Sequence, residues 1–127
     1  MLLASDIRSN LQLITQVFAP LIGKRLLDVG CGSGSLLGAL LKRVAAVGVD
    51  SSEKALSLVR ARIPEADVHL GEASSLPFPA ETFDGAILLN RLHHLSAGEI
   101  EAAIGETLRV VKARGRVLVI EAPVPGM

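Results

Sequence analysis

The chain has 127 residues, a length typical of one domain with a buried core, and a formal net charge of zero. That charge balance and the scarcity of aromatic side chains (only Phe18, Phe78 and Phe83, with no Tyr or Trp) argue against a nucleic-acid partner. Its single cysteine, Cys31, excludes an internal disulfide, and no apolar run is long enough for a signal peptide or a membrane span. We therefore expect one cytoplasmic domain over residues 1–127, with no nucleic-acid or membrane partner.

Helix and strand patterns alternate along the chain. Apolar residues at helical spacing predict a first helix over residues 6–19, which Pro20 limits. Ser96 and Glu99 form a capping box that opens the last helix. The expected strands are residues 25–30, 45–50, 66–72, 83–90 and 115–122, and the helices between them are residues 33–44, 51–63 and 96–112. Strict alternation of this kind predicts an α/β fold with a parallel sheet.

Three glycines follow the first expected strand directly, in the stretch LLDVGCGSGSL. Ligands of parallel sheets bind beyond the carboxyl ends of the strands, and Gly30, Gly32 and Gly34 would let a ligand approach backbone N–H groups there. A sharp turn from strand to helix is the alternative explanation of these glycines. Polar residues end the other strands at the same edge, namely Asp50, Glu72 and Asn90. We therefore expect a ligand site at this edge.

The spacing of the glycines bears on the kind of ligand. Nicotinamide dinucleotides are bound by the pattern G-x-G-x-x-G/A, whereas this chain has G-x-G-x-G with Ser35 where the third small residue should fall. Asp28 would repel a pyrophosphate but would accept hydrogen bonds from an ammonium group. Asp50 would accept hydrogen bonds from two ribose hydroxyls or, alternatively, cap the helix that follows. A nucleoside with an amino-acid tail fits these residues better than a dinucleotide.

Five stretches of the chain resemble, in order, the successive motifs of class I S-adenosylmethionine-dependent methyltransferases. They are LLDVGCGSG, VGVDSSEKAL, LGEASSLPFP, FDGAILLNRLHHL and GRVLVIEAP, and they are most similar to the group of ubiquinone and menaquinone C-methyltransferases. The resemblance covers about residues 20–123. It implies a Rossmann-like, doubly wound sheet of strand order 3-2-1-4-5 with flanking helices, in which residues 1–22 form an N-terminal helical segment and residues 23–127 the cofactor-binding core. It also implies S-adenosylmethionine as cofactor, S-adenosylhomocysteine as product and a small-molecule methyl acceptor.

The resemblance assigns roles to single residues. Asp28 and the glycine loop would hold the methionine end of the cofactor, Asp50 its ribose, and Glu72 with Ala73 its adenine. Asn90 and Arg91 would lie beside the transferable methyl group. The full set of implied cofactor contacts is Asp28, Gly30, Cys31, Gly32, Gly34, Asp50, Ser51, Glu72, Ala73, Asn90 and Arg91.

Two kinds of side chain suggest chemistry beyond cofactor binding. His93 is the candidate catalytic base, needed only if the acceptor must lose a proton, and a structural role for His93 and His94 is the alternative. Adjacent histidines without a third ligand do not indicate a metal site. Cys31 is expected to fill space in the glycine loop rather than to act as a nucleophile.

The chain departs from the family pattern at three points. Glu72 stands where an Asp is usual, and KARGR, residues 112–116, replaces a Lys-Pro-Gly-Gly turn. The basic side chains of this region, from Arg109 to Arg116, are expected to meet a helix end, with phosphate binding as the alternative.

The usual C-terminal antiparallel hairpin is lacking, which leaves the fifth strand as an unpaired edge. Two hypotheses follow, a homodimer that covers this edge or a fragment of a longer protein. The rival function is a non-catalytic module that binds S-adenosylmethionine or S-adenosylhomocysteine and works with a partner chain.

Overall fold

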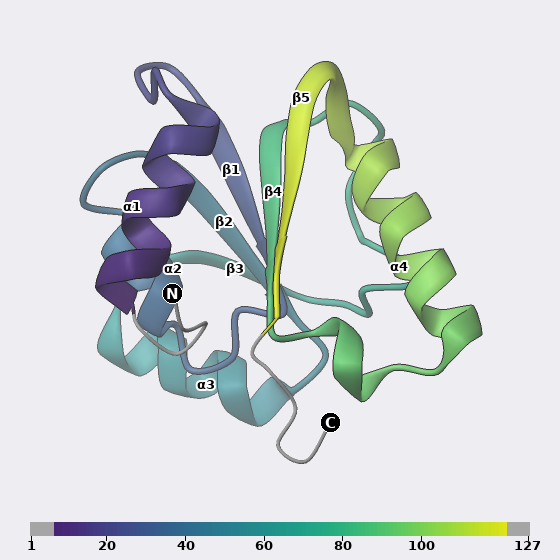
Figure 1. Cartoon of the computed structure of the whole chain (residues 1–127). Helices are drawn as coiled ribbons and strands as arrows, with labels where there is room; N and C mark the ends of the chain where they lie inside the picture. Colours follow the sequence, from purple (N-terminus) through teal and green to yellow (C-terminus); the bar gives the residue numbers. More distant parts are fainter. Residues whose placement is uncertain (1–6, 122–127) are drawn as a thin grey trace.

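A five-stranded parallel sheet with helices on both faces forms the centre of the computed structural model, which describes residues 7–121 (Figure 1). The strand order is β3-β2-β1-β4-β5, which confirms the expected Rossmann-like, doubly wound arrangement. In chain order the elements are α1 (Ile7–Phe18), β1 (Arg25–Val29), α2 (Ser35–Leu40), β2 (Ala45–Asp50), α3 (Glu53–Arg62), β3 (Asp67–Leu70), β4 (Phe83–Leu89), the 3-10 turn η1 (Leu92–His94), α4 (Ala97–Val110) and β5 (Val111–Ile120).

Strand β1 is the centre of the sheet and marks the point where the strand order reverses. It pairs with β2 on one side and β4 on the other, in parallel register. Successive side chains of a strand point to opposite faces, so Leu26 and Asp28 share one face while Leu27 and Val29 share the other. The carboxyl ends of β1, β2 and β4 therefore meet at one edge, where a parallel sheet binds its ligands.

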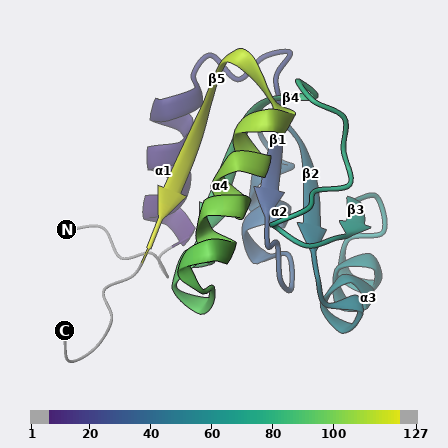
Figure 2. The same cartoon turned by 90° about the vertical axis from the view of Figure 1, so that its right-hand side faces the viewer.

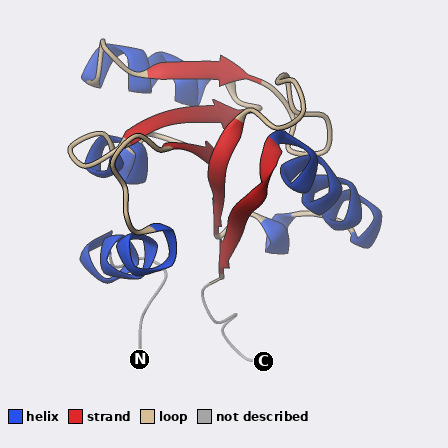
Figure 3. Ribbon diagram, turned by 90° about the horizontal axis from the view of Figure 1, so that it is seen from above, coloured by secondary structure: helices blue, strands red, loops and turns tan. Residues whose placement is uncertain are grey.

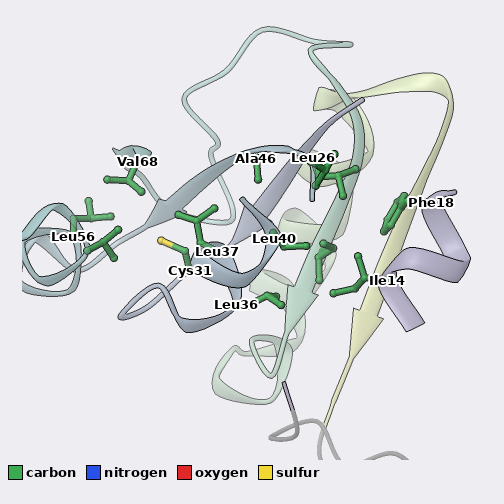
Figure 4. Packing of buried hydrophobic residues seen from close by; sticks show 13 residues of the cluster. Ile14, Phe18, Leu26, Cys31, Leu36, Leu37, Leu40, Ala46, Leu56 and Val68 are labelled. Atoms are coloured by element: carbon green, nitrogen blue, oxygen red, sulfur yellow. The ribbon is translucent and has the colours of Figure 1, made fainter. Parts of the chain in front are cut away.

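Two apolar clusters fill the two faces of the sheet. Side chains of α1, α2 and α3 pack on the face that carries Leu26, as Figure 4 shows for Ile14, Leu37 and Leu56. Helix α4 covers the opposite face, where Val110 packs with Leu27 and the fully buried Phe83. Figure 3, seen from above, shows α4 on one side of the sheet and the other helices on the other.

Helix α2 is shorter than the expected 33–44, because the chain must bury Val44 as it enters β2. Val44 is 8% exposed and packs in the core. The N–H groups of Arg43 and Val44 both donate to the carbonyl oxygen of Leu40, at 2.8 and 3.0 Å, and close the helix in tight turns.

Strand β5 begins at Val111, directly after α4, four residues before the expected start. Phe83 pairs with Val111 and Gly85 with Arg116, so the intervening residues of β5 bulge out of the ladder. Lys112 Nζ lies 3.3 Å from Asp84 Oδ1, and a Cβ on Gly115 would lie 2.5 Å from the Asp84 carbonyl oxygen. The bulge thus lies at residues 112–115, where the family pattern has its Lys-Pro-Gly-Gly turn before the fifth strand.

Most of the basic cluster around β5 has structural partners. Arg109 Nε lies 2.6 Å from Glu106 Oε2, and Arg116 Nη1 donates to the Val17 carbonyl oxygen at 3.2 Å. Together with the Lys112–Asp84 ion pair, these contacts favour a structural role of the basic side chains over phosphate binding.

The outer edge of β5 is unpaired within the described part of the chain. β5 pairs with β4 alone, and no strand of residues 7–121 lies along its other side (Figure 2). Among the same residues, no helix has both the length and the apolar character that crossing a membrane requires.

Candidate functional site

The glycine loop turns the chain sharply from β1 into α2. Gly30, Gly32 and Gly34 have φ angles of 76°, 55° and 87°, a left-handed conformation that glycine adopts without steric cost. The N–H groups of Gly30 and Cys31 donate to the carbonyl oxygen of Val49, at 2.7 and 3.0 Å. The loop is therefore a tight turn held against the end of β2, and this requirement accounts for part of its glycine content.

Asp50 joins the glycine loop to the start of α3. The residue is 9% exposed. Its Oδ2 accepts from the Gly32 N–H and its Oδ1 from the Ser52 N–H, both at 2.8 Å. Ser52, rather than Asp50, is the N-cap of α3, because its hydroxyl accepts from the Ala55 N–H at 3.1 Å. Each carboxylate oxygen of Asp50 keeps lone-pair capacity for a further donor, such as a ribose hydroxyl.

Asp28 is a buried carboxylate with an unused acceptor atom. Its residue is 2% exposed, and Oδ2 makes no hydrogen bond with the described residues. Burial raises the pKa of Asp28 from 3.8 to about 7; Arg91 opposes this rise and Asp50 adds to it. A buried oxygen without a donor is the feature expected where a ligand ammonium binds.

Cys31 lies beside Asp28 in the loop. Burial, with the nearby charges of Asp28 and Asp50, raises the pKa of its thiol to about 12. The protonated thiol is a poor nucleophile, which supports the space-filling role over thiol chemistry.

A first cavity of about 160 Å³ lies beyond the ends of β1 and β2. It brings together six of the predicted site residues, namely Gly30, Asp50, Ser51, Glu72, Ala73 and Arg91. His94, Leu95 and Glu99 complete its wall from the side of η1 and α4. The first cavity therefore contains both the expected ribose-binding residue, Asp50, and the expected adenine-binding residues, Glu72 and Ala73.

The segment that carries Glu72 and Ala73 is fixed by α4. The Leu76 N–H donates to Glu106 Oε1 at 2.8 Å, and Arg109 Nη2 donates to the Leu76 carbonyl oxygen at 3.1 Å. The hydrogen bond from Arg109 also lowers the pKa of Glu106. Leu76 is buried in the core, so this loop has a defined position against the first cavity.

A second cavity of about 210 Å³ lies on the other side of the glycine loop. Its wall contains the predicted residues Asp28, Gly30, Cys31, Gly32 and Arg91, along with Ser33, Ser35 and Leu89. Of residues 7–121, only Gly30 and Arg91 belong to both cavities. An elongated ligand that filled both would pass these two residues.

The side chain of Arg91 lies along the glycine loop. A Cβ on Gly30 would come within 2.7 Å of Arg91 Cγ and 2.8 Å of Nε, and a Cβ on Gly32 within 3.3 Å of Nη2. Arg91 Nε is buried and makes no hydrogen bond with the described residues. Glycine is thus also required at position 30 because another side chain approaches it closely.

Three predicted site residues lie outside both cavities. Gly34 is the N-cap of α2, and a Cβ there would lie 3.0 Å from Val59 Cγ2. Asn90 directly follows β4 with a φ of 55°, and its N–H donates to the Ile120 carbonyl oxygen at 2.7 Å. His93 Nδ1 lies 2.6 Å from Glu121 Oε2, so its ring is held by the end of β5.

His94, rather than His93, lines the first cavity, and the sequence pattern could not separate these neighbours. Their ring centroids are 4.0 Å apart, but Glu121 binds the first ring and also accepts from the Leu92 N–H at 2.7 Å. The sequence predicts only a capping-box role for Glu99. The structure confirms this capping box with Ser96 and also places Glu99 in the wall of the first cavity. Among residues 7–121, no three His, Cys, Asp or Glu side chains are placed to hold a metal ion.

Comparison with known proteins gives a family match over most of the chain. Residues 26–115 match the family model described as "Methyltransferase domain". A demethylmenaquinone methyltransferase of Symbiobacterium thermophilum is 36% identical over 113 residues, which are 81% of this chain and 44% of that protein.

Solved structures agree with the fold. The crystal structure of YcgJ from Bacillus subtilis is 29% identical with a TM-score of 0.80, over 88% of this chain and 50% of YcgJ. The S-adenosylmethionine-bound structure of CalS10, an amino pentose methyltransferase from Micromonospora echinaspora, has a TM-score of 0.81 at 24% identity, over 94% of this chain and 50% of CalS10. The chain thus spans about half the length of each of these three proteins.

Proposed function

This chain belongs to the methyltransferase domain family, and on that premise we propose that it binds S-adenosylmethionine and transfers the methyl group to a small-molecule acceptor. CalS10, with the same fold, is described as bound to S-adenosylmethionine, which supports the choice of cofactor. The methyl acceptor of this chain is unidentified.

The observation that carries the proposal is a pair of neighbouring cavities that share Gly30 as a lining residue, each with a buried carboxylate in its wall. Asp50 lies in the wall of the first cavity, where its free lone pairs suit ribose hydroxyls. Asp28 lies in the wall of the second, where its unpaired Oδ2 suits the ammonium of an amino acid. The residues present therefore fit an adenosyl amino acid better than a dinucleotide, whose pyrophosphate would meet Asp28.

Binding and orientation are the main tasks of these residues in methyl transfer. When bound, S-adenosylmethionine supplies an activated methyl group on a sulfonium, so positioning and exclusion of water contribute much of the rate. Glu72 and the N–H of Ala73 would hold the adenine, and the glycine loop the amino-acid part. If the acceptor must lose a proton, His94 is better placed than His93 to take it, because His94 lines the first cavity whereas the His93 ring is paired with Glu121.

The relatives are named for more than one class of acceptor. Two of them are named for a demethylmenaquinone and for an amino pentose, both small molecules. Two tRNA methyltransferases, of Xenopus tropicalis and Arabidopsis thaliana, also match the chain, at 36% and 38% identity. We propose a small-molecule acceptor because the chain has no net charge and few aromatic side chains with which to bind a nucleic acid.

A non-catalytic binding module is the second candidate function. It is favoured by the side chain of Arg91, which lies over the glycine loop between the two cavities. Such a module would hold S-adenosylmethionine or S-adenosylhomocysteine without transfer.

Calorimetry followed by a transfer assay tests both candidates. Titration with S-adenosylmethionine, S-adenosylhomocysteine and NADH should show binding of the first two alone. Incubation with radiolabelled methyl donor and a panel of quinones and amino sugars should then label an acceptor. Binding without any labelling favours the module, and binding of NADH alone overturns the proposal.

A second copy of the chain is proposed as the partner of β5. Apolar residues lie along this edge strand, and Val119 is 41% exposed. Pairing of two such edges would satisfy their backbone groups and cover these side chains. Sedimentation at micromolar concentration should give the mass of two chains, and the mass of one chain would contradict the dimer. A cytoplasmic location belongs to the same proposal, since the one cysteine is buried and free.

A further inference from the structure

Arg91 stands where the two halves of the proposed ligand must join. We propose that its guanidinium is a specificity determinant that disfavours the sulfonium of S-adenosylmethionine relative to the thioether of S-adenosylhomocysteine. This inference rests on the proposed function, because it assumes that an adenosyl amino acid occupies both cavities.

Geometry places the sulfur of such a ligand near Arg91. The sulfur of an adenosyl amino acid connects the nucleoside to the amino-acid tail. The nucleoside half fits the cavity with Asp50, and the tail fits the cavity with Asp28. Within the described part of the chain, Gly30 and Arg91 alone are common to both walls, so the connecting atom must pass them.

The side chain of Arg91 is packed against the loop rather than extended into solvent. Its Cγ and Nε lie against Gly30, and its Nη2 lies near Gly32. Its Nε is buried without a hydrogen-bond partner among residues 7–121. No carboxylate of the described residues forms a salt bridge with it, so its charge is not neutralised by direct contact.

The charge of Arg91 already acts on the second cavity. It favours the ionised form of Asp28 and so opposes the rise in the pKa of that group. Arginine stays protonated at all physiological pH values. A positive charge that reaches a carboxylate in one cavity wall also reaches a ligand atom that passes beside it.

The two ligand forms differ in charge at one atom. S-adenosylmethionine carries a positive sulfur and one methyl group more than S-adenosylhomocysteine, while the adenosine, ammonium and carboxylate are common to both. Repulsion from Arg91 therefore acts on the first form alone. At this partly buried position we expect the repulsion to change the ratio of the two dissociation constants by about five- to tenfold.

Carboxylates around the two cavities favour the sulfonium form and so oppose the repulsion from Arg91. Asp28, Asp50, Glu72 and Glu99 line the two walls and attract a sulfonium. They are unchanged when Arg91 alone is replaced. A comparison of variants at position 91 therefore isolates the contribution of its charge.

Calorimetric titration of both ligands into wild-type protein, Arg91→Met and Arg91→Lys tests the inference. Arg91→Met keeps an unbranched side chain without the charge, and it should lower the ratio of the S-adenosylmethionine to the S-adenosylhomocysteine dissociation constant by about five- to tenfold. Arg91→Lys should keep the wild-type ratio. Arg114→Met, which removes an exposed charge near the amino end of β5, is the matched control and should also keep it.

The outcomes separate this inference from the proposed function. An unchanged ratio in Arg91→Met, with both ligands bound, overturns the role of Arg91 and leaves the proposed function intact. Failure of the wild-type protein to bind either ligand overturns both. Circular dichroism checks the fold of each variant, and Arg91→Gln replaces Arg91→Met if that variant does not fold.

Discussion

Replacing Asp28 by asparagine should make the protein more stable, and increasingly so as pH rises from about 4 to 7. Burial raises the pKa of this carboxyl from 3.8 to about 7. Between these values the folded protein keeps a proton that the unfolded chain has released. The unfolded state then binds fewer protons than the native state, so the free energy of unfolding falls as pH rises through this interval.

The size of the effect follows from the same two values. A rise from 3.8 to about 7 corresponds to about 4 kcal/mol of stability lost once the carboxyl is ionised in both states. Asparagine has nearly the same shape and no charge. We expect Asp28→Asn to exceed the wild type in unfolding free energy by about 2–4 kcal/mol at pH 8, and by less than about 1 kcal/mol at pH 4.

Urea unfolding of both proteins, at intervals from pH 4 to pH 8, measures this difference. Other titrating groups are shared, so they cancel when the two curves are subtracted. A difference that stays constant across the interval would refute the assignment of the buried charge to Asp28. The same variant should bind S-adenosylmethionine more weakly, because an amide is a poorer partner for an ammonium than a carboxylate.

Three further substitutions test other parts of the site. Asp50→Ala should weaken cofactor binding by about 1–3 kcal/mol in calorimetry, because bound hydroxyls lose their acceptor, and an unchanged dissociation constant would leave Asp50 a structural role only. Gly30→Ala should lower the free energy of unfolding by about 1–3 kcal/mol, since φ is 76° and the Arg91 side chain occupies the position of the new Cβ; Gly98→Ala, where no atom lies within 4 Å, is the control and should not destabilise. His94→Gln should slow transfer to an acceptor that loses a proton by about 10²-fold or more, and an equal or larger loss in His93→Gln would contradict the placement of His94 in the cavity wall.

Local sequence patterns were sufficient to predict much of the fold. β4 is apolar nearly throughout, as a strand covered on both faces should be, and the capping box at Ser96 opens α4 as expected. The end of α2 and the start of β5 depended instead on packing between distant residues. Val44 is buried in the core and Val111 pairs with Phe83, and neither contact is visible in a short window of sequence.

The candidate site was predictable where strand ends determined it. Asp28, Gly30 and Asp50 lie at the carboxyl ends of β1 and β2, and the structure places all three in cavity walls. The choice between His93 and His94 depended on Glu121, which is distant in sequence and binds the first ring. The path of the Arg91 side chain across the glycine loop was equally inaccessible, because a rotamer is selected by the groups that surround it.

A crystal structure of the protein with S-adenosylhomocysteine tests the central claim most directly. We expect the ribose hydroxyls on Asp50, the ammonium on Asp28 and the sulfur beside Gly30 and Arg91. A ligand bound away from the glycine loop, or a crevice that Arg91 keeps closed at saturating ligand concentration, would contradict the account.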